Sequence, residues 1–339
     1  MWQRRMFSPI SPSIRYTKHS PKVHYWQRSR IGEYVLTGPM VLGQESSGLV
    51  VEVGEQVKDL KPGDRVSLEP GIPCRRCDYC RKGSYNLCGS MAFAATPPFD
   101  GTLTKFYNND ADFCYKIADN MDLEEGAMVE PVAVAVAICK QADLRAHQTV
   151  LVLGCGPIGV LCQAVAKTWG ASRVVGVDII QSRLNVAKSY GIDDIFLPSR
   201  QEDGTDPIIH AEKVAAQLNK ECGLGDGPDV VLECSGAESC IQLGIFAARK
   251  GATFVQAGMG KENVTFPITA VCIKGLRIQG SIRYTTGCFP TAIDLISSGK
   301  IEVKKLITNR FGFHDAEEAF DLVKEGRPDV FKVMIEGVQ

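Results

Sequence analysis

The stretch that decides the fold is Thr149-Val150-Leu151-Val152-Leu153-Gly154-Cys155-Gly156-Pro157-Ile158-Gly159. Its apolar opening predicts a parallel strand that is covered on both faces. A Gly-x-Gly-x-x-Gly turn follows and leads into a helix-like run that ends near Trp169. The next predicted strand, 174–178, ends in an acidic residue, Asp178. This order of strand, glycine turn, helix, strand and acid is typical of a dinucleotide-binding unit.

Each residue of the turn has a physical role in such a unit. Gly154 permits the tight turn, Gly156 lets the backbone approach a pyrophosphate, and Gly159 allows the helix to pack closely on the strand. Pro157 and Ile158 begin the helix, whose N-terminal N–H groups and partial positive charge favour phosphate. An ordinary glycine turn is the structural alternative. The surrounding pattern favours the cofactor site.

Asp178 indicates which dinucleotide the site takes. A carboxylate at this place accepts hydrogen bonds from the ribose hydroxyls and repels a 2′-phosphate. The sequence therefore favours NAD over NADP. Arg183 is close enough in sequence to flank the adenosine, and it is equally compatible with a solvated helix position.

The pattern of predicted strands and helices divides the chain into domains. Further apolar segments at 229–233 and 252–256 continue the strand–helix alternation, which predicts a doubly wound α/β domain over residues 140–280. Before it, segments 48–54 and 61–66 read as strands with turns, so residues 1–139 are expected to form a β-rich domain. Residues 281–339 are expected to return to that first domain.

Four cysteines lie close together in the β-rich domain, within a predicted lobe at 74–88. The spacing Cys74-x2-Cys77-x2-Cys80-x7-Cys88 suits one tetrahedral Zn²⁺, a closed site that folds the lobe without taking part in chemistry. A disulfide cluster and unconnected buried thiols are the alternatives. The nine other cysteines lie mostly in apolar surroundings, as in Val271-Cys272-Ile273, and read as small core residues. This usage predicts a reducing cytosol.

Composition limits the classes of partner. The chain has 339 residues, 45% of them hydrophobic, enough to bury the cores of two domains. A net charge of -1 argues against nucleic acid or an anionic membrane as the main partner. No apolar run reaches the roughly 18 residues of a transmembrane helix. Residues 1–32 contain seven basic and no acidic residues. This is compatible with a mitochondrial leader, a disordered tail or a start foreign to the fold.

Taken together, these motifs resemble the medium-chain zinc alcohol dehydrogenase superfamily, in particular its polyol branch of sorbitol and xylitol dehydrogenases. The resemblance covers residues 23–339, and within this branch the sequence looks most like the fungal D-xylulose reductases. It is carried by the zinc lobe, the glycine turn and five further segments, which are Val23-His24-Tyr25-Trp26, Gly43-Gln44-Glu45-Ser46-Ser47-Gly48, 95–101, Met128-Val129-Glu130-Pro131 and Gly280-Ser281-Ile282-Arg283-Tyr284. The resemblance implies a GroES-like β-rich catalytic domain, a Rossmann NAD-binding domain and a homo-oligomer, either a tetramer or a dimer.

The resemblance also implies the reaction, in which NAD takes a hydride from a polyol such as xylitol or sorbitol to give a ketose. The positions that match the family's polyol pocket are Tyr25, Phe106, Glu130, Arg283 and Tyr284. Gly258 and Ile282 match positions near the cofactor.

This sequence departs from the family at the catalytic zinc. Glu45 matches a glutamate that binds the zinc and Glu130 a glutamate near the metal's water, but the cysteine ligand falls on His19 and the histidine ligand on Gln44. The proton-relay serine falls on Pro21. Either His19 replaces one ligand or it faces solvent in a divergent segment. The chain is accordingly either a polyol dehydrogenase or an inactive, NAD-binding relative, for example the product of a mis-assembled gene.

The chain also departs from the family in its N-terminal part. About half of the family's first forty residues of β-structure have no counterpart here. The first domain is therefore expected to be incomplete, with unpaired strand edges.

Overall fold

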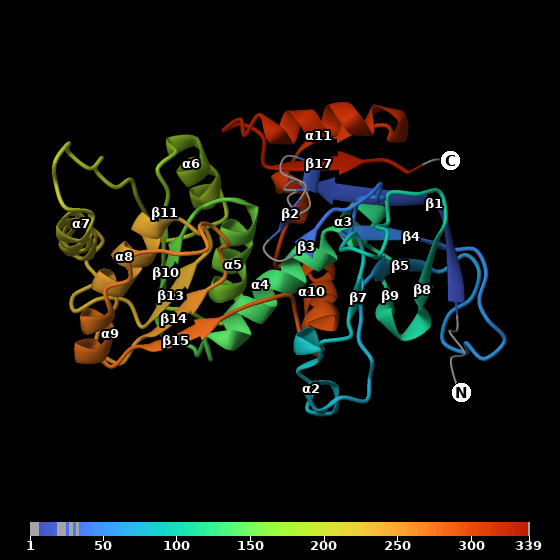
Figure 1. Ribbon diagram of the computed structural model, residues 1–339, viewed down its shortest axis with the longest axis horizontal. Coiled ribbons are helices and arrows are strands. Elements are labelled where there is room, and N and C mark those ends of the chain that lie inside the picture. Colours follow the sequence, from blue (N-terminus) through green and yellow to red (C-terminus); the bar gives the residue numbers. More distant parts are fainter. Residues whose placement is uncertain (1–6, 19–24, 27–29, 32–33, 338–339) are drawn as a thin grey trace. The chain divides into compact units, whose positions relative to one another are not determined.

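The structure is a computed structural model that describes residues 7–18, 25–26, 30–31 and 34–337 (Figure 1). The chain forms two compact units. Unit 1 combines residues 1–133 with 284–339, and unit 2 consists of residues 134–283. The first unit is therefore built from both ends of the chain, and the second is inserted between them.

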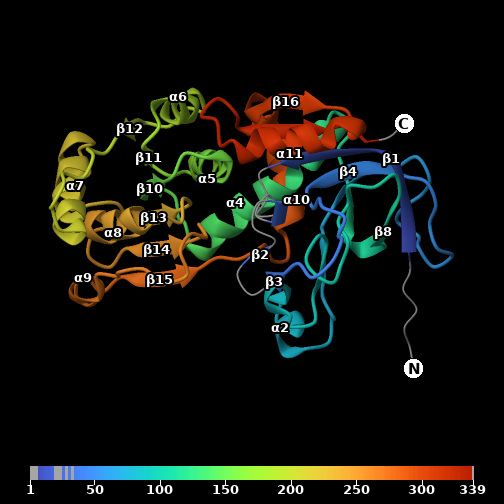
Figure 2. The same ribbon diagram turned by 45° about the horizontal axis from the view of Figure 1, so that its top comes forward.

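Unit 2 is a six-stranded parallel sheet in the order β12-β11-β10-β13-β14-β15. Figure 2 shows these strands side by side in that order. The strands are β10 (Thr149–Leu153), β11 (Arg173–Val177), β12 (Asp194–Phe196), β13 (Val230–Glu233), β14 (Thr253–Gln256) and β15 (Arg277–Gly280). The connecting helices are α5 (Pro157–Thr168), α6 (Gln181–Ser189), α7 (Pro207–Glu221), α8 (Glu238–Ala247) and α9 (Ile268–Lys274). This topology confirms the predicted doubly wound fold.

The apolar strands explain why this sheet forms. Residues 150–153 and 174–177 are buried along their whole length, as expected for central parallel strands. One apolar cluster fills the space between the sheet and its helices, with Leu151, Val231 and Phe254 among its members. Strand β10 lies between β11 and β13, so the chain order along the sheet reverses there. In sheets of this kind ligands bind outside the carboxyl ends of the strands at this reversal.

Unit 1 is built on a seven-stranded sheet. Its main path is β16-β17-β1-β4-β5-β9, and β8 pairs with β1. The strands are β1 (Phe7–Lys18), β4 (Ser46–Val50), β5 (Arg65–Leu68), β8 (Tyr107–Asp110), β9 (Cys114–Lys116), β16 (Ile307–Phe311) and β17 (Lys332–Ile335). Two short hairpins, β2 (Arg30–Ile31) with β3 (Tyr34–Val35) and β6 (Gly71–Ile72) with β7 (Ala92–Phe93), accompany it. The helices are α2 (Asp78–Arg81), α3 (Leu123–Ala127), α10 (Cys288–Ser297) and α11 (Ala316–Lys324), while α4 (Val129–Gln141) begins in unit 1 and ends in unit 2.

The expectation of unpaired strand edges in this domain was wrong for the middle of the sheet. Strand β1 lies between β17 and β4 and is antiparallel to both, with Tyr16 opposite Ile335 and Ser11 opposite Leu49. The N-terminal residues therefore supply a central strand of this sheet. A strand needs backbone hydrogen bonds more than a particular side-chain pattern, which is why the sequence did not reveal it.

Two further expectations need correction. Helices α3 and α4 lie in the stretch that was expected to be β-rich, and α3 begins with a capping box in which Asp122 and Glu125 each bond the other's backbone N–H. Cys272 is exposed and is therefore not a core residue. In the described part of the chain, no helix combines the length and apolar character that crossing a bilayer requires.

Candidate functional site

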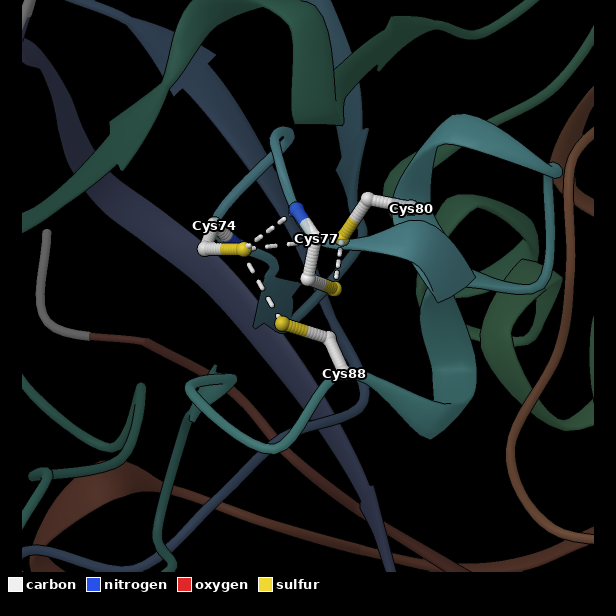
Figure 3. Close-up of side chains that lie close together, drawn as sticks. All are labelled: Cys74, Cys77, Cys80 and Cys88. Carbon is white, nitrogen blue, oxygen red and sulfur yellow. Dashed lines mark hydrogen bonds between the residues drawn. The ribbon is translucent and has the colours of Figure 1, made fainter.

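The four cysteines of the lobe at 74–88, which connects β6 to β7 in the sequence, point their sulfur atoms toward one another (Figure 3). All four sulfur atoms lie within 4.8 Å of one another. The Sγ atoms of Cys77 and Cys80 are 3.4 Å apart, and those of Cys74 and Cys80 are 3.8 Å apart. Four sulfurs at about 2.3 Å from a tetrahedral zinc ion would be separated by about 3.8 Å. The arrangement therefore fits one Zn²⁺ with four sulfur ligands.

The same four side chains are free thiols, as are the nine other cysteines. The backbone N–H groups of Arg76 and Cys77 lower the pKa of Cys74 to about 6, whereas removal from water raises the pKa of Cys80 to about 12. Four thiolates this close repel one another, so a cation is needed to hold all of them ionised. The four sulfur atoms thus have a geometry that suits zinc. When they are ionised, they also carry the negative charge that zinc compensates.

Two contacts attach this lobe to the sheet of unit 1. Arg75, which adopts a φ of 62°, donates hydrogen bonds to Asp110 at 2.7 Å and to Asp112 at 2.9 Å. Tyr85 donates through its hydroxyl to Oε1 of Glu69 at 2.6 Å, and Tyr115 donates to Oε2 at 2.9 Å. Glu69 is fully buried, and burial raises its pKa to about 7. The lobe is therefore held by two ion pairs of one arginine and by one buried acid.

The glycine turn of unit 2 has the geometry that a dinucleotide site requires. Gly154 has a φ of 92°, and a Cβ on Gly159 would lie 1.8 Å from the carbonyl oxygen of Gly154. Gly156 caps α5 and faces open space, because a Cβ placed there would meet no atom within 4 Å. Pro157 and Ile158 form the first turn of that helix. The N-terminus of α5 is thus accessible to a phosphate group.

Asp178 is fixed beside this turn. Its Oδ2 accepts a hydrogen bond from Cys155 N at 2.8 Å, and its Oδ1 accepts one from Ile180 N at 2.9 Å. A carboxylate oxygen can accept more than one hydrogen bond, so both oxygens keep capacity for ribose hydroxyls. Arg183 lies half-buried in the first turn of α6.

The remaining predicted cofactor residues lie after β14 and β15. Gly258 donates its N–H to the carbonyl oxygen of Glu233 at 2.9 Å, in the loop that follows β14. Ile282 is exposed after β15, and Arg283 beside it has a φ of 57°, in the left-handed region. All three belong to unit 2.

The predicted polyol-pocket residues of unit 1 differ in burial. Tyr25, Glu130 and Tyr284 are buried, and the Tyr284 ring packs edge-on against Phe289 at 5.0 Å. Phe106 is 53% exposed, with Lys105 Nζ 5.9 Å from its ring centre. Three of the predicted residues are thus enclosed by the unit, and Phe106 lies at its surface.

Glu45 has a partner that sequence analysis missed. It lies directly before β4, is 2% exposed, and forms an ion pair with Lys332 of β17, which is fully buried. Strands β4 and β17 both flank β1, which explains how residues so far apart in the sequence meet. A lone lysine in the apolar run Val330-Phe331-Lys332-Val333-Met334-Ile335 was the available signal. A buried ammonium requires a partner.

This pairing bears on the catalytic zinc that the family implies. The Lys332 ammonium contacts the carboxylate that would bind the metal, and two cations cannot share it without repulsion. Gln44 is buried, and its Oε1 accepts no hydrogen bond from the residues that the structure describes. An amide oxygen is a weak replacement for imidazole at zinc. His19 and Pro21 lie outside the described residues. Among the residues that the structure describes, Glu45 paired with Lys332 and the amide of Gln44 do not form a donor set that suits a second zinc ion.

Comparisons with known proteins assign the chain to a family. Residues 16–119 match the alcohol dehydrogenase GroES-like domain, and residues 157–298 match the zinc-binding dehydrogenase family. A curated relative, probable D-xylulose reductase A of Aspergillus fumigatus, is 51% identical over 94% of this chain and 86% of its own length.

Solved structures agree with this assignment. The L-idonate 5-dehydrogenase of Escherichia coli K-12 superposes with a TM-score of 0.86 at 27% identity, over 99% of this chain and 92% of its own. A structure described as a short chain alcohol dehydrogenase of Escherichia coli CFT073, in complex with NADH, gives 0.86 at 25% identity, over 97% and 91%. The chain belongs to the zinc-containing medium-chain alcohol dehydrogenase superfamily and is an oxidoreductase of its polyol dehydrogenase branch.

Proposed function

We propose that this chain binds NAD and oxidises a polyol such as xylitol to the corresponding ketose. The observation that carries the proposal is the placement of Asp178, whose two oxygens are fixed by Cys155 N and Ile180 N beside the glycine turn. A carboxylate held there accepts the ribose hydroxyls and repels the 2′-phosphate of NADP. The name of the Aspergillus relative, D-xylulose reductase, supports the substrate class.

The residues that we propose to bind the polyol are Tyr25, Glu130, Tyr284 and Phe106 of unit 1, and the resemblance adds Arg283 of unit 2. Aromatic rings suit the C–H face of a sugar alcohol, and carboxylate, guanidinium and phenol groups suit its hydroxyls. Glu130 and Tyr284 are buried, so their side chains are held in place by packing rather than by solvent. Each residue binds or orients the substrate in this proposal.

The reaction balances as follows. The carbinol carbon transfers a hydride to the nicotinamide ring of NAD⁺, the hydroxyl loses its proton to a base, and the products are a ketone and NADH. Hydride leaves readily only after the hydroxyl has lost its proton, so an unassisted neutral alcohol reacts slowly. The zinc held by the four cysteines supplies no such assistance, because four sulfur ligands close its coordination sphere.

The ion pair of Glu45 with Lys332 favours a second candidate, a catalytically impaired NAD-binding relative. In this candidate the chain binds one zinc ion, in the cysteine lobe, and oxidises polyols or reduces ketoses only slowly. The two candidates share the fold, the cofactor and the lobe. They differ in metal content and turnover.

One experiment separates the candidates. The purified chain is analysed for zinc by mass spectrometry, titrated with NADH and NADPH by fluorescence, and assayed for NADH consumption with D-xylulose. We expect about one zinc per chain, NADH binding at least about 10-fold tighter than NADPH binding, and slow turnover. A zinc content near two with rapid turnover would refute the impaired state. Failure to bind NADH would refute the proposed function.

A double variant, His19→Cys with Gln44→His, is the companion test. It restores the ligand types of the family, and we expect zinc content and turnover to rise together. Gln44→Asn is the matched control, because it changes the same side chain without supplying imidazole. If the double variant bound a second zinc yet oxidised no polyol, the substrate class would be wrong.

We also propose that the chain is a homo-oligomer, as the resemblance implies, and that the edge of the unit 2 sheet takes part. Strand β15 ends the sheet, all four of its residues are exposed, and Ile273 and Ile278 beside and within it are 72% and 39% exposed. An uncovered strand edge with apolar neighbours favours pairing with another chain. Light scattering of the protein and of Ile278→Lys tests this: a wild-type monomer would overturn it.

A reducing compartment, the cytosol, is the proposed location. All thirteen cysteines are free thiols, and the lobe requires four of them reduced to bind zinc. Fractionation of cells that express the tagged full chain tests this location, with recovery in mitochondria as the contrary result.

A further inference from the structure

Glu233 is a buried carboxylate at the carboxyl end of β13, in the unit that would bind the dinucleotide. It is fully buried, and it is in register with Leu153 of β10 on one side and Gln256 of β14 on the other. These three adjacent strands thus end at the same level, next to the reversal of strand order between β10 and β13. A charge buried at this place requires several hydrogen-bond donors.

The Glu233 side chain bonds both loops that leave these strand ends. From the loop after β13 it accepts hydrogen bonds from Ser235 N at 2.9 Å, from Ser235 Oγ, and from Gly236 N at 3.0 and 2.9 Å to its two oxygens. From the end of β14 it accepts one from Gln256 Nε2 at 2.7 Å. Gln256 Nε2 also donates to Gly258 O at 2.7 Å.

The two loops are in contact at glycines that leave no room for a side chain. A Cβ on Gly258 would lie 2.1 Å from Gly236 N, and a Cβ on Gly260 would lie 1.8 Å from Gly236 O. Gly236 itself has a φ of 73°. A small movement of either loop would therefore force the other to move.

The contact extends to the glycine turn after β10. A Cβ on Gly154 would lie 2.9 Å from Ser235 Cβ, so the turn packs directly on the residue whose backbone and hydroxyl both bond Glu233. Three loops at the carboxyl ends of β10, β13 and β14 thus depend on one carboxylate. The crevice for a dinucleotide lies outside these strand ends.

We infer that Glu233 is a positioning residue for the dinucleotide: it holds the loops after β13 and β14, and through Ser235 the glycine turn, in the conformation that binds the cofactor. This inference rests on the proposed NAD function. The donors on Glu233 are all neutral N–H and O–H groups, so replacing the carboxylate by an amide of the same size changes the charge and the hydrogen bonding but not the packing volume. In Glu233→Gln, the new NH₂ group is itself a donor. It faces the N–H groups of the loops and cannot accept a hydrogen bond from them.

The test compares Glu233→Gln with Asp229→Asn. Asp229 is the matched control, since it lies just before the same strand at its other end, where its carboxylate accepts Thr149 N at 2.8 Å and pairs with Arg249 at 2.5 Å. Losing one buried donor–acceptor pair corresponds to about 10-fold in an equilibrium constant. We expect the NADH dissociation constant of Glu233→Gln to rise at least about 10-fold, and that of Asp229→Asn to stay within about 2-fold.

Hydrogen exchange gives a readout that does not depend on binding. In Glu233→Gln, amides of 234–240 and 256–261 should exchange faster while those of β10 and β11 keep their protection. If this variant binds NADH like the wild type, or if Asp229→Asn weakens binding equally, the positioning role is wrong. Should Glu233→Gln not fold, Gln256→Leu removes only the donor that links the loops and is expected to weaken binding about 3- to 10-fold. A wild type that fails to bind NADH would overturn the proposed function instead, whatever the exchange data show.

Discussion

Replacing Lys332 by methionine should destabilise unit 1 strongly. The Lys332 side chain is fully buried and the Glu45 side chain is 2% exposed, so the substitution leaves a buried carboxylate without its cation. Breaking a buried ion pair from one side costs about 3–5 kcal/mol. Proteins of about 150–250 residues lose about 2–4 °C in melting temperature per kcal/mol. We therefore expect the melting temperature of unit 1 to fall by about 6 to 20 °C.

Calorimetry measures this shift, and hydrogen exchange of β17 peptides assigns it to unit 1. The matched control is Lys304→Met, which breaks a pair with Asp122 at 2.7 Å whose side chains are 47% and 48% exposed. A pair that open to solvent contributes about 1 kcal/mol or less. Lys332→Met combined with Glu45→Gln should recover most of the lost stability, because no buried charge then remains unpaired.

If Lys332→Met and Lys304→Met lower the melting temperature by the same small amount, the Lys332–Glu45 pair is not a strong buried ion pair. A double variant that is less stable than Lys332→Met alone would contradict it as well. The zinc content of Lys332→Met adds a second readout. Removing the ammonium takes this cation away from Glu45, so a second zinc bound only by this variant would show that Lys332 excludes the metal.

Three further predictions concern other parts of the chain. The pKa of Glu69 is raised from 4.5 to about 7, chiefly by burial, so the folded protein keeps a proton that the unfolded chain has released. The buried acid of Glu69 contributes fully to stability below about pH 4.5, and this contribution is lost as the pH rises through 7. Denaturant titrations of the wild type should therefore show a loss of about 3 kcal/mol in the free energy of unfolding between these two pH values, relative to Glu69→Gln. Equal slopes in both proteins would contradict the buried acid. Cys80→Ser should lose the zinc of the lobe and make 74–88 sensitive to protease, whereas Cys272→Ser, at an exposed thiol, should change neither. The Lys274 ammonium donates to three carbonyls at the end of α8, those of Ile245, Phe246 and Ala248. Lys274→Met should therefore lower the stability of unit 2 by about 1.5–3 kcal/mol, and a loss below 0.5 kcal/mol in thermal unfolding would argue against this cap.

The Rossmann part of the fold could be predicted from the sequence because its signals are local. An apolar strand, a glycine turn and an acidic strand end lie within thirty residues of each other, from Thr149 to Asp178. The four cysteines are equally local, within 74–88. Local patterns can be recognised without knowledge of tertiary contacts, because they depend only on residues that are close together in the sequence.

The contacts that the sequence did not reveal are nonlocal. The ion pair of Glu45 with Lys332 joins residues 287 positions apart, and β1 is a strand only because β17 and β4 flank it. The Glu233 network is local in part, since the Ser235 and Gly236 donors follow it directly, but the donor from Gln256 comes from the next strand. In each case the partner is set by the topology of the sheet rather than by spacing along the chain.

The place of β1 between β4 and β17 has a consequence for how the chain is made. Strand β17 begins at Lys332, so the sheet of unit 1 cannot be completed until almost the whole chain has left the ribosome. Unit 2, whose last residue is 283, can fold before that. Domains fold as units during synthesis, and long-range strand pairing is slow. Strand β1 therefore waits for β17 long after it has itself been synthesised, and a chain shortened before Lys332 should yield a folded dinucleotide unit joined to an unfinished β-rich one.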